Sequence, residues 1–110
     1  HHHCDNLVAI VDYNKIQSLG RVKEVMDLDP FAEKWNSFGW SVREINGHNL
    51  KEVDSALSQI PYEAGRPNCI IAHTIKGKDV SFMEDKLLWH SRSPPDEEFE
   101  AALKELELGS

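Results

Sequence analysis

The chain has 110 residues, of which 40% are hydrophobic, so its composition is that of one globular domain with a core of its own rather than a disordered segment. Its formal net charge of −7 argues against a nucleic-acid-binding protein, because such proteins need a basic face, and no window approaches the roughly 18 apolar residues of a membrane span. No apolar stretch of a signal peptide follows the polar N-terminus, and two cysteines, Cys4 and Cys69, are too few for a disulfide scaffold, so we expect a cytoplasmic protein.

The two ends of the sequence resemble additions to a natural chain. His1-His2-His3 resembles a tag remnant and Gly109-Ser110 a cloning scar, so both are left out of the fold prediction. A metal site built from the three histidines and Cys4 is the alternative for the N-terminus.

The first predicted element is a strand over residues 7–11, which read LVAIV. A continuous apolar run of this kind is typical of a strand that is buried on both faces of a parallel sheet. The polar segment 14–23 follows, and without an apolar period it is predicted as a loop.

A helix is predicted over residues 30–38, with Asp29 as its N-cap and Pro30 at its first position. Apolar residues recur along it at helical spacing, and Gly39 ends it. We interpret this stripe as core packing, and a cofactor-binding aromatic box is the alternative. The stripe comprises Phe31, Trp35 and Phe38.

The remaining elements alternate in type along the chain. A half-buried or edge strand is expected over 40–45, a helix over 50–60 capped by Asn49, and an apolar strand over 68–75. Residues 76–93 look irregular, with a short helical turn possible within 83–89, and a last helix begins at the Pro94-Pro95 pair. Its buried stripe is expected to comprise Phe99, Ala102, Leu103 and Leu106.

This order predicts an α/β fold, with a parallel sheet of about three strands and flanking helices, as one domain over residues 1–110. Such sheets bind ligands beyond the carboxyl ends of their strands, where the loops 12–20, 46–49 and 76–90 lie. In the first loop, Asn14 offers an amide oxygen and Ile16 a main-chain carbonyl, which suits Mg²⁺ or Ca²⁺. The simpler alternative is that Asn14 only tolerates an awkward turn.

Two further residues in the third loop are candidates for binding. Lys76, directly after a strand, can meet a phosphate as a point charge. His90 is either structural or solvated, or it donates to substrate oxygens or relays protons.

Four segments together resemble the thiamine-diphosphate-binding domain of transketolase, most closely the N-terminal subunit of the split, two-subunit form. They read DNLVAIVDYNKIQSLG, FAEKWNSFGWSVREINGHN, IIAHTIKGK and EDKLLWHSRSPPDEEFEAALKELE, and they cover nearly the whole chain in order. Deoxyxylulose-phosphate synthase is a close relative, and Glu84-Asp85-Lys86 before Trp89-His90 favours transketolase.

The resemblance implies a role for each candidate. Asn14 matches the residue that closes the family's metal-diphosphate signature, and Ile16 matches the residue whose carbonyl completes the Mg²⁺ shell. Lys76 matches a lysine that contacts thiamine diphosphate, and His90 a histidine that faces both the cofactor and a sugar-phosphate substrate. Asp12 lies where the family varies and receives no ligand role.

The sequence also departs from the family pattern. Asp79 replaces the second glycine of Gly-Lys-Gly, Ser91 follows the histidine where Tyr or Gly is common, and Cys4 stands where a basic residue is common. The half of the signature that opens on Gly-Asp-Gly is not in these residues. We therefore expect that a complementary chain or an N-terminal part supplies it, that a pyrimidine-binding subunit completes an oligomer, and that the 110 residues alone are inactive. The alternative is a truncated or engineered α/β assembly unit without catalysis.

Overall fold

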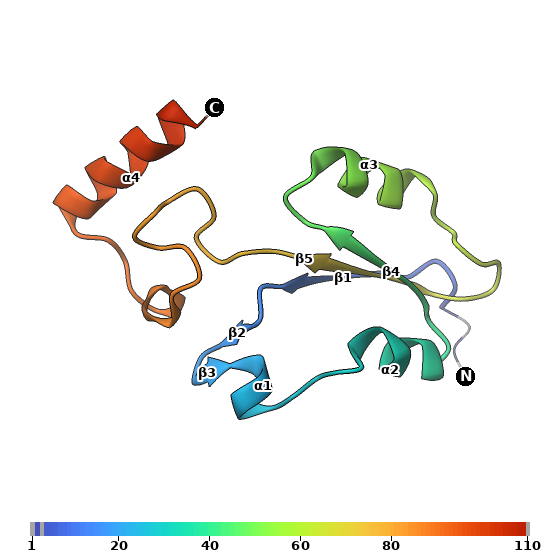
Figure 1. Cartoon of the computed structure of the whole chain (residues 1–110). Helices are drawn as coiled ribbons and strands as arrows, with labels where there is room; N and C mark the ends of the chain where they lie inside the picture. The colour runs from blue at the N-terminus through green and yellow to red at the C-terminus, as the bar shows by residue number, and fades with distance from the viewer. Residues whose placement is uncertain (1, 3, 110) are drawn as a thin grey trace. The chain divides into compact units, whose positions relative to one another are not determined.

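The computed structural model describes residue 2 and residues 4–109, which form two compact units (Figure 1). One unit combines residues 28–74 with the segment that ends at residue 13, and the other combines residues 14–27 with those from 75 onward. Of the predicted tag and scar residues, His1, His3 and Ser110 lie outside the described part, as does most of the histidine cluster. The prediction of one domain over residues 1–110 stays a prediction.

The first unit is built on a parallel sheet, as predicted. Its strands are β1 (Val8–Tyr13), β4 (Ser41–Asn46) and β5 (Asn68–His73), in the spatial order β1-β5-β4. Helices α2 (Phe31–Ser37) and α3 (Leu50–Ser58) lie on opposite faces of this sheet (Figure 1). The structure confirms the predicted α/β class, because each strand-to-strand crossover carries a helix.

The core of the first unit lies around the central strand β5. Cys69, Ile70 and Ile71 are almost completely buried, and burial raises the pKa of the Cys69 thiol to about 11. The side chain of Asn68 is also buried, and its Oδ1 accepts a hydrogen bond of 2.9 Å from the Tyr62 amide. A buried polar group is tolerated here because it is hydrogen-bonded.

The first strand corrects the prediction of burial on both faces. Val8 and Ile10 share one face of β1, with 37% and 61% of their surfaces exposed. Among the described residues, β1 pairs only with β5, so it is an edge strand. An apolar run shows that a strand can be buried on both faces, but it does not supply the neighbouring elements that would cover it.

The helices of the first unit agree with the predictions except in two details. Residue 30, rather than Asp29, occupies the N-cap of α2, and it makes no side-chain hydrogen bond there. The last aromatic residue of the stripe, Phe38, is 84% exposed and does not lie in the core. Phe31 does pack, with its ring centroid 5.3 Å from that of Tyr13. The predicted cap of α3 is confirmed, because Asn49 Oδ1 accepts from the Lys51 amide at 3.1 Å.

The second unit contains small elements that the sequence did not reveal. The predicted loop 14–23 holds the antiparallel hairpin β2 (Ile16–Gln17) and β3 (Gly20–Arg21), followed by α1 (Val22–Val25). A 3₁₀ turn, η1 (Leu87–His90), and the last helix, α4 (Asp96–Leu108), complete this unit.

The predicted buried stripe of α4 is largely exposed. Only Ala102 is buried, whereas Phe99, Leu103 and Leu106 keep between 39% and 49% of their surfaces exposed. Helical spacing predicted the stripe correctly, but the described residues do not cover it. No helix in the described part of the chain is long and apolar enough to cross a membrane.

Candidate functional site

The carboxyl ends of β1 and β5 are joined within the first unit. The Asp12 carboxylate, at the end of β1, accepts a hydrogen bond from the hydroxyl of Thr74, directly after β5. This contact gives Asp12 a structural role. Both strands then continue directly into the second unit, which contains all four of the predicted site residues.

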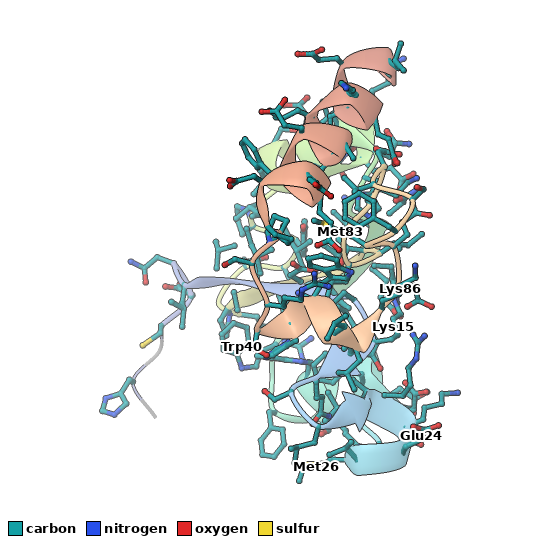
Figure 2. All side chains as sticks on the ribbon, turned by 90° about the vertical axis from the view of Figure 1, so that its left-hand side faces the viewer. Lys15, Glu24, Met26, Trp40, Met83 and Lys86 are labelled. Atoms are coloured by element: carbon teal, nitrogen blue, oxygen red, sulfur yellow. The ribbon has the colours of Figure 1, made fainter. Side chains whose placement is uncertain are left out.

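Asn14 stabilises the turn between β1 and β2. Its Oδ1 accepts a hydrogen bond of 3.0 Å from the Ile16 amide, and the intervening Lys15, labelled in Figure 2, has a φ of +65°. An asparagine side chain that bonds to the backbone two residues on is a known way to form such a turn. The bond uses one of the two lone pairs of the oxygen, so the turn role and a ligand role are compatible.

The main-chain carbonyl of Ile16 points away from the hairpin. The Val22 amide donates to the Lys15 carbonyl at 2.9 Å, and Ile16 is paired with Arg21 at the next position of the hairpin. In an antiparallel ladder, hydrogen-bonded pairs alternate with pairs whose backbone groups point outward. The carbonyl of Ile16 therefore lies on the outer edge of β2, the edge at which its amide meets Asn14.

These two oxygens fit a hard cation only in part. Amide and carbonyl oxygens are suitable ligands for Mg²⁺, but both are neutral. Within the part of the chain that the structure describes, no group of three or more His, Cys, Asp or Glu residues could hold a metal ion. A complete cation site would therefore need an anionic ligand in addition to Asn14 and Ile16.

Lys76 begins a tightly folded loop. Its carbonyl accepts a hydrogen bond of 2.9 Å from the Asp85 amide, which closes the loop on itself. Next to it, Gly77 has a φ of +68°, and a Cβ there would lie 2.7 Å from the Cβ of Met83 (labelled in Figure 2). Asp79 also has a φ of +68°, so the aspartate that departs from the family pattern does occupy a left-handed conformation.

His90 lies at the end of η1 and contacts the hairpin. Its Nε2 is 3.0 Å from the hydroxyl oxygen of Ser18, at the turn between β2 and β3. The preceding Trp89 is fixed by a hydrogen bond of 3.0 Å from its Nε1 to the Phe82 carbonyl. The structure therefore brings the loop that carries His90 and the Asn14 loop together within one unit.

An ion pair joins the same two segments. Nη1 and Nη2 of Arg21, in β3, donate to the Asp85 carboxylate, and Nη2 also donates to the Asp85 carbonyl at 3.1 Å. These hydrogen bonds hold the pKa of Asp85 below its usual range. Sequence reasoning missed Ser18, Arg21 and Asp85 as neighbours of the site, because nothing local links residues more than sixty positions apart.

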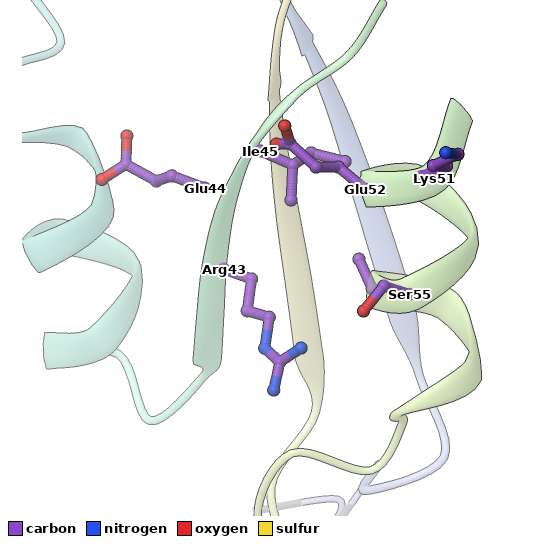
Figure 3. Close-up of a pocket in the computed structure, with 7 residues that line it drawn as sticks. Arg43, Glu44, Ile45, Lys51, Glu52 and Ser55 are labelled. Atoms are coloured by element: carbon purple, nitrogen blue, oxygen red, sulfur yellow. The ribbon is translucent and has the colours of Figure 1, made fainter. Parts of the chain in front are cut away.

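Surface hollows in the first unit contain none of the four predicted site residues. A hollow of about 320 Å³ lies between β4 and α3, and its lining includes the charged residues Arg43 and Glu52, which Figure 3 shows. Both side chains have structural partners there, because Arg43 lies over the Tyr62 ring at 4.3 Å and Glu52 accepts from the Asn46 amide at 2.8 Å. An aromatic hollow of about 260 Å³ lies beside α2. It is lined by Phe31, Lys34, Trp35, Phe38 and Trp40.

Comparison with known proteins gives a consistent answer. Residues 1–108 match the family described as "Transketolase, thiamine diphosphate binding domain". The 6-deoxy-6-sulfo-D-fructose transketolase subunit SqwG of Clostridium sp. is 45% identical over 94% of this chain and 38% of its own length. An apulose-4-phosphate transketolase subunit of Phocaeicola vulgatus is 41% identical over 93% of this chain and 36% of its own length. The chain thus spans little more than a third of these relatives.

A solved structure and a more distant sequence relative agree with this result. A transketolase from Campylobacter jejuni superposes with a TM-score of 0.86 over 96% of this chain and 16% of that one, at 27% identity. Human transketolase is 31% identical over 93% of this chain and 16% of its own length.

Proposed function

The chain belongs to the transketolase family, as a thiamine diphosphate-binding domain, and on that premise we propose that it supplies part of a magnesium–thiamine-diphosphate site for two-carbon ketol transfer between sugar phosphates. It would be the C-terminal portion of a cofactor-binding domain. The observation that carries this proposal is that Asn14 Oδ1 and the outward carbonyl of Ile16 share one edge of β2.

Each candidate has a role that follows from its chemistry. Asn14 and Ile16 would hold Mg²⁺ through neutral oxygens, and Lys76 would meet the cofactor as a point charge. His90 would face the substrate and hold or move a proton at a ring nitrogen. When bound, thiamine diphosphate supplies the carbon nucleophile that takes the two-carbon unit from a ketose.

The chain would act only with a partner. The related proteins from Clostridium and Phocaeicola are named as transketolase subunits, which supports an assembly with a second chain. We propose that other parts supply the anionic Mg²⁺ ligand and the pyrimidine-binding site, and that the 110 residues alone have no turnover. The names of the same relatives specify sulfo- and phospho-sugars, which supports an anionic sugar as substrate.

Replacing Asn14 tests the proposal. In the full-length protein bound to its partner chain, Asn14→Ala should weaken Mg²⁺-dependent binding of thiamine diphosphate by at least about 10-fold to 100-fold, the range typical of losing an outer-shell contact of a metal site. Calorimetric titration with thiamine diphosphate and Mg²⁺ measures this. Asn36→Ala, at an exposed asparagine of α2, is the control and should bind as the wild type does. Equal affinity in both variants would refute the assigned site.

A second candidate function rests on the exposed edge of the sheet. Within the described part of the chain, β1 pairs only with β5, and it exposes Val8 and Ile10. Open apolar edges favour pairing between copies, so the alternative is a non-catalytic assembly unit. Light scattering separates the two functions, because a strict monomer at high concentration contradicts assembly.

A further inference from the structure

The contact between Ser18 and His90 suggests a role that the proposed function does not include. Ser18 Oγ lies 3.0 Å from His90 Nε2, across a sequence separation of 72 residues. Both side chains are exposed, so neither is needed to fill a core. A hydrogen bond between two exposed side chains contributes little to stability, and its clearest effect is on the orientation of the ring.

Both residues of this contact lie on segments that other contacts anchor. Ser18 lies at the turn of the β2–β3 hairpin, where Gln17 pairs with Gly20. His90 ends η1, directly after Trp89, which is fixed through Phe82. The Arg21–Asp85 ion pair ties the hairpin to the loop that carries η1. The hydroxyl and the imidazole are therefore presented to each other by two anchored segments.

The contact distinguishes the two ring nitrogens. Nε2 faces Ser18, and the described residues offer Nδ1 no hydrogen-bond partner. In a neutral imidazole one nitrogen donates and the other accepts, and the partner of one nitrogen sets the tautomer. A serine hydroxyl can donate or accept, and where it donates to Nε2 the ring proton lies on Nδ1.

We propose that Ser18 is a positioning residue for His90: its hydroxyl donates to Nε2, fixes the ring and keeps the proton on Nδ1. Nδ1 is then the nitrogen that faces an anionic sugar and holds or moves the proton. This inference rests on the proposed function, because it assigns His90 to that site. Ser18 itself touches neither the substrate nor the cofactor in this role.

The tautomer can be measured without activity. We suggest ¹⁵N-histidine labelling of the full-length protein in complex with its partner chain, with His90 assigned by a His90→Gln variant. The wild type should show a protonated Nδ1 and an accepting Nε2, and Ser18→Ala should shift the signals toward a mixture of tautomers. Ser93→Ala, at an exposed serine of the same unit, is the control and should leave them unchanged.

A matched pair of variants isolates the hydroxyl. Ser18→Thr keeps it, and Ser18→Val replaces it with a methyl group of similar size, so the comparison stands even if the alanine variant fails to fold. The threonine variant should retain the tautomer and the kcat for ketol transfer, and the valine variant should lose the tautomer and about fivefold in kcat with little change in KM.

The outcomes separate this inference from the proposed function. If the wild-type complex binds no thiamine diphosphate, the proposed function fails, and the assignment of His90 to that site fails with it, whatever the tautomer. If it binds the cofactor and the threonine and valine variants behave alike in tautomer and kcat, the role of Ser18 is refuted and the proposed function stands.

Discussion

At the scale of single residues, the loop after Lys76 depends on backbone conformations that most side chains avoid. Gly77 and Asp79 both have a φ of +68°, on either side of Lys78. The Lys78 ammonium is 2.7 Å from the Asp79 carboxylate and 2.9 Å from that of Glu84, and these contacts raise the pKa of Lys78. The loop therefore combines left-handed backbone conformations with local ion pairs. Gly77 is also needed because a side chain there would clash with Met83.

Gly77→Ala should destabilise the protein by about 2–4 kcal/mol, since it adds the cost of a left-handed alanine to that of overpacking. The new Cβ would meet the Met83 Cβ at 2.7 Å and its backbone at 2.8 Å. Gly65→Ala is a matched control, because Gly65 also has a positive φ, +78°, but nothing lies within 4 Å of its Cβ position. Urea denaturation of both variants measures the difference, and equal losses would contradict the steric argument.

At the scale of elements, polar side-chain contacts join the segments of the second unit. Its hairpin has only two residues in each strand, and an isolated hairpin is at best marginally stable in water. The Arg21–Asp85 ion pair joins the hairpin to the loop before η1, and the Ser81 hydroxyl donates to Glu105 of α4 at 2.7 Å. In the second unit, polar contacts therefore provide much of the stabilisation that apolar burial provides around β5.

The Arg21–Asp85 pair predicts a pH dependence of stability. Because the pKa of Asp85 is lowered in the folded state, its contribution is present above the pKa of an unfolded aspartate, about 4, and is lost as the pH falls through the lower folded value. Asp85→Asn should therefore be less stable than the wild type at pH 7, and the difference should shrink as the medium is acidified below the pKa of an unfolded aspartate. Asparagine also tolerates the φ of +56° at this position.

Urea denaturation at neutral and at acidic pH measures this effect. Asp54→Asn is the control, because Asp54 is exposed on α3 and has no ion pair among the described residues. The difference from the wild type should change more with pH for Asp85→Asn than for Asp54→Asn. A constant difference for Asp85→Asn would show that the ion pair does not contribute.

At the scale of the whole molecule, the sequence predicted the elements that have a clear pattern along one segment. It missed short elements and contacts between distant segments, which have no such pattern. Periodicity predicted β4 and α3, a continuous apolar run predicted β5, and the alternation of strands and helices predicted the parallel sheet. The β2–β3 hairpin was missed, since strands of two residues have no period to detect. Asn14 and Ile16 could be proposed from their spacing, but the Ser18–His90 contact spans 72 positions and leaves no local pattern. The exposure of β1 depends on neighbours that its own residues do not encode.

The exposed face and edge of β1 predict how the 110-residue chain behaves alone. Ile10 is 61% exposed beside Val8 on an edge strand, and such strands pair with other copies unless a charge interrupts them. Ile10→Lys should therefore lower the concentration-dependent mass measured by light scattering. Leu19→Lys, at an 82% exposed residue of the hairpin turn, adds the same charge away from β1 and should associate as the wild type does. If both lysine variants lower the concentration-dependent mass equally, the effect comes from the added charge rather than from β1.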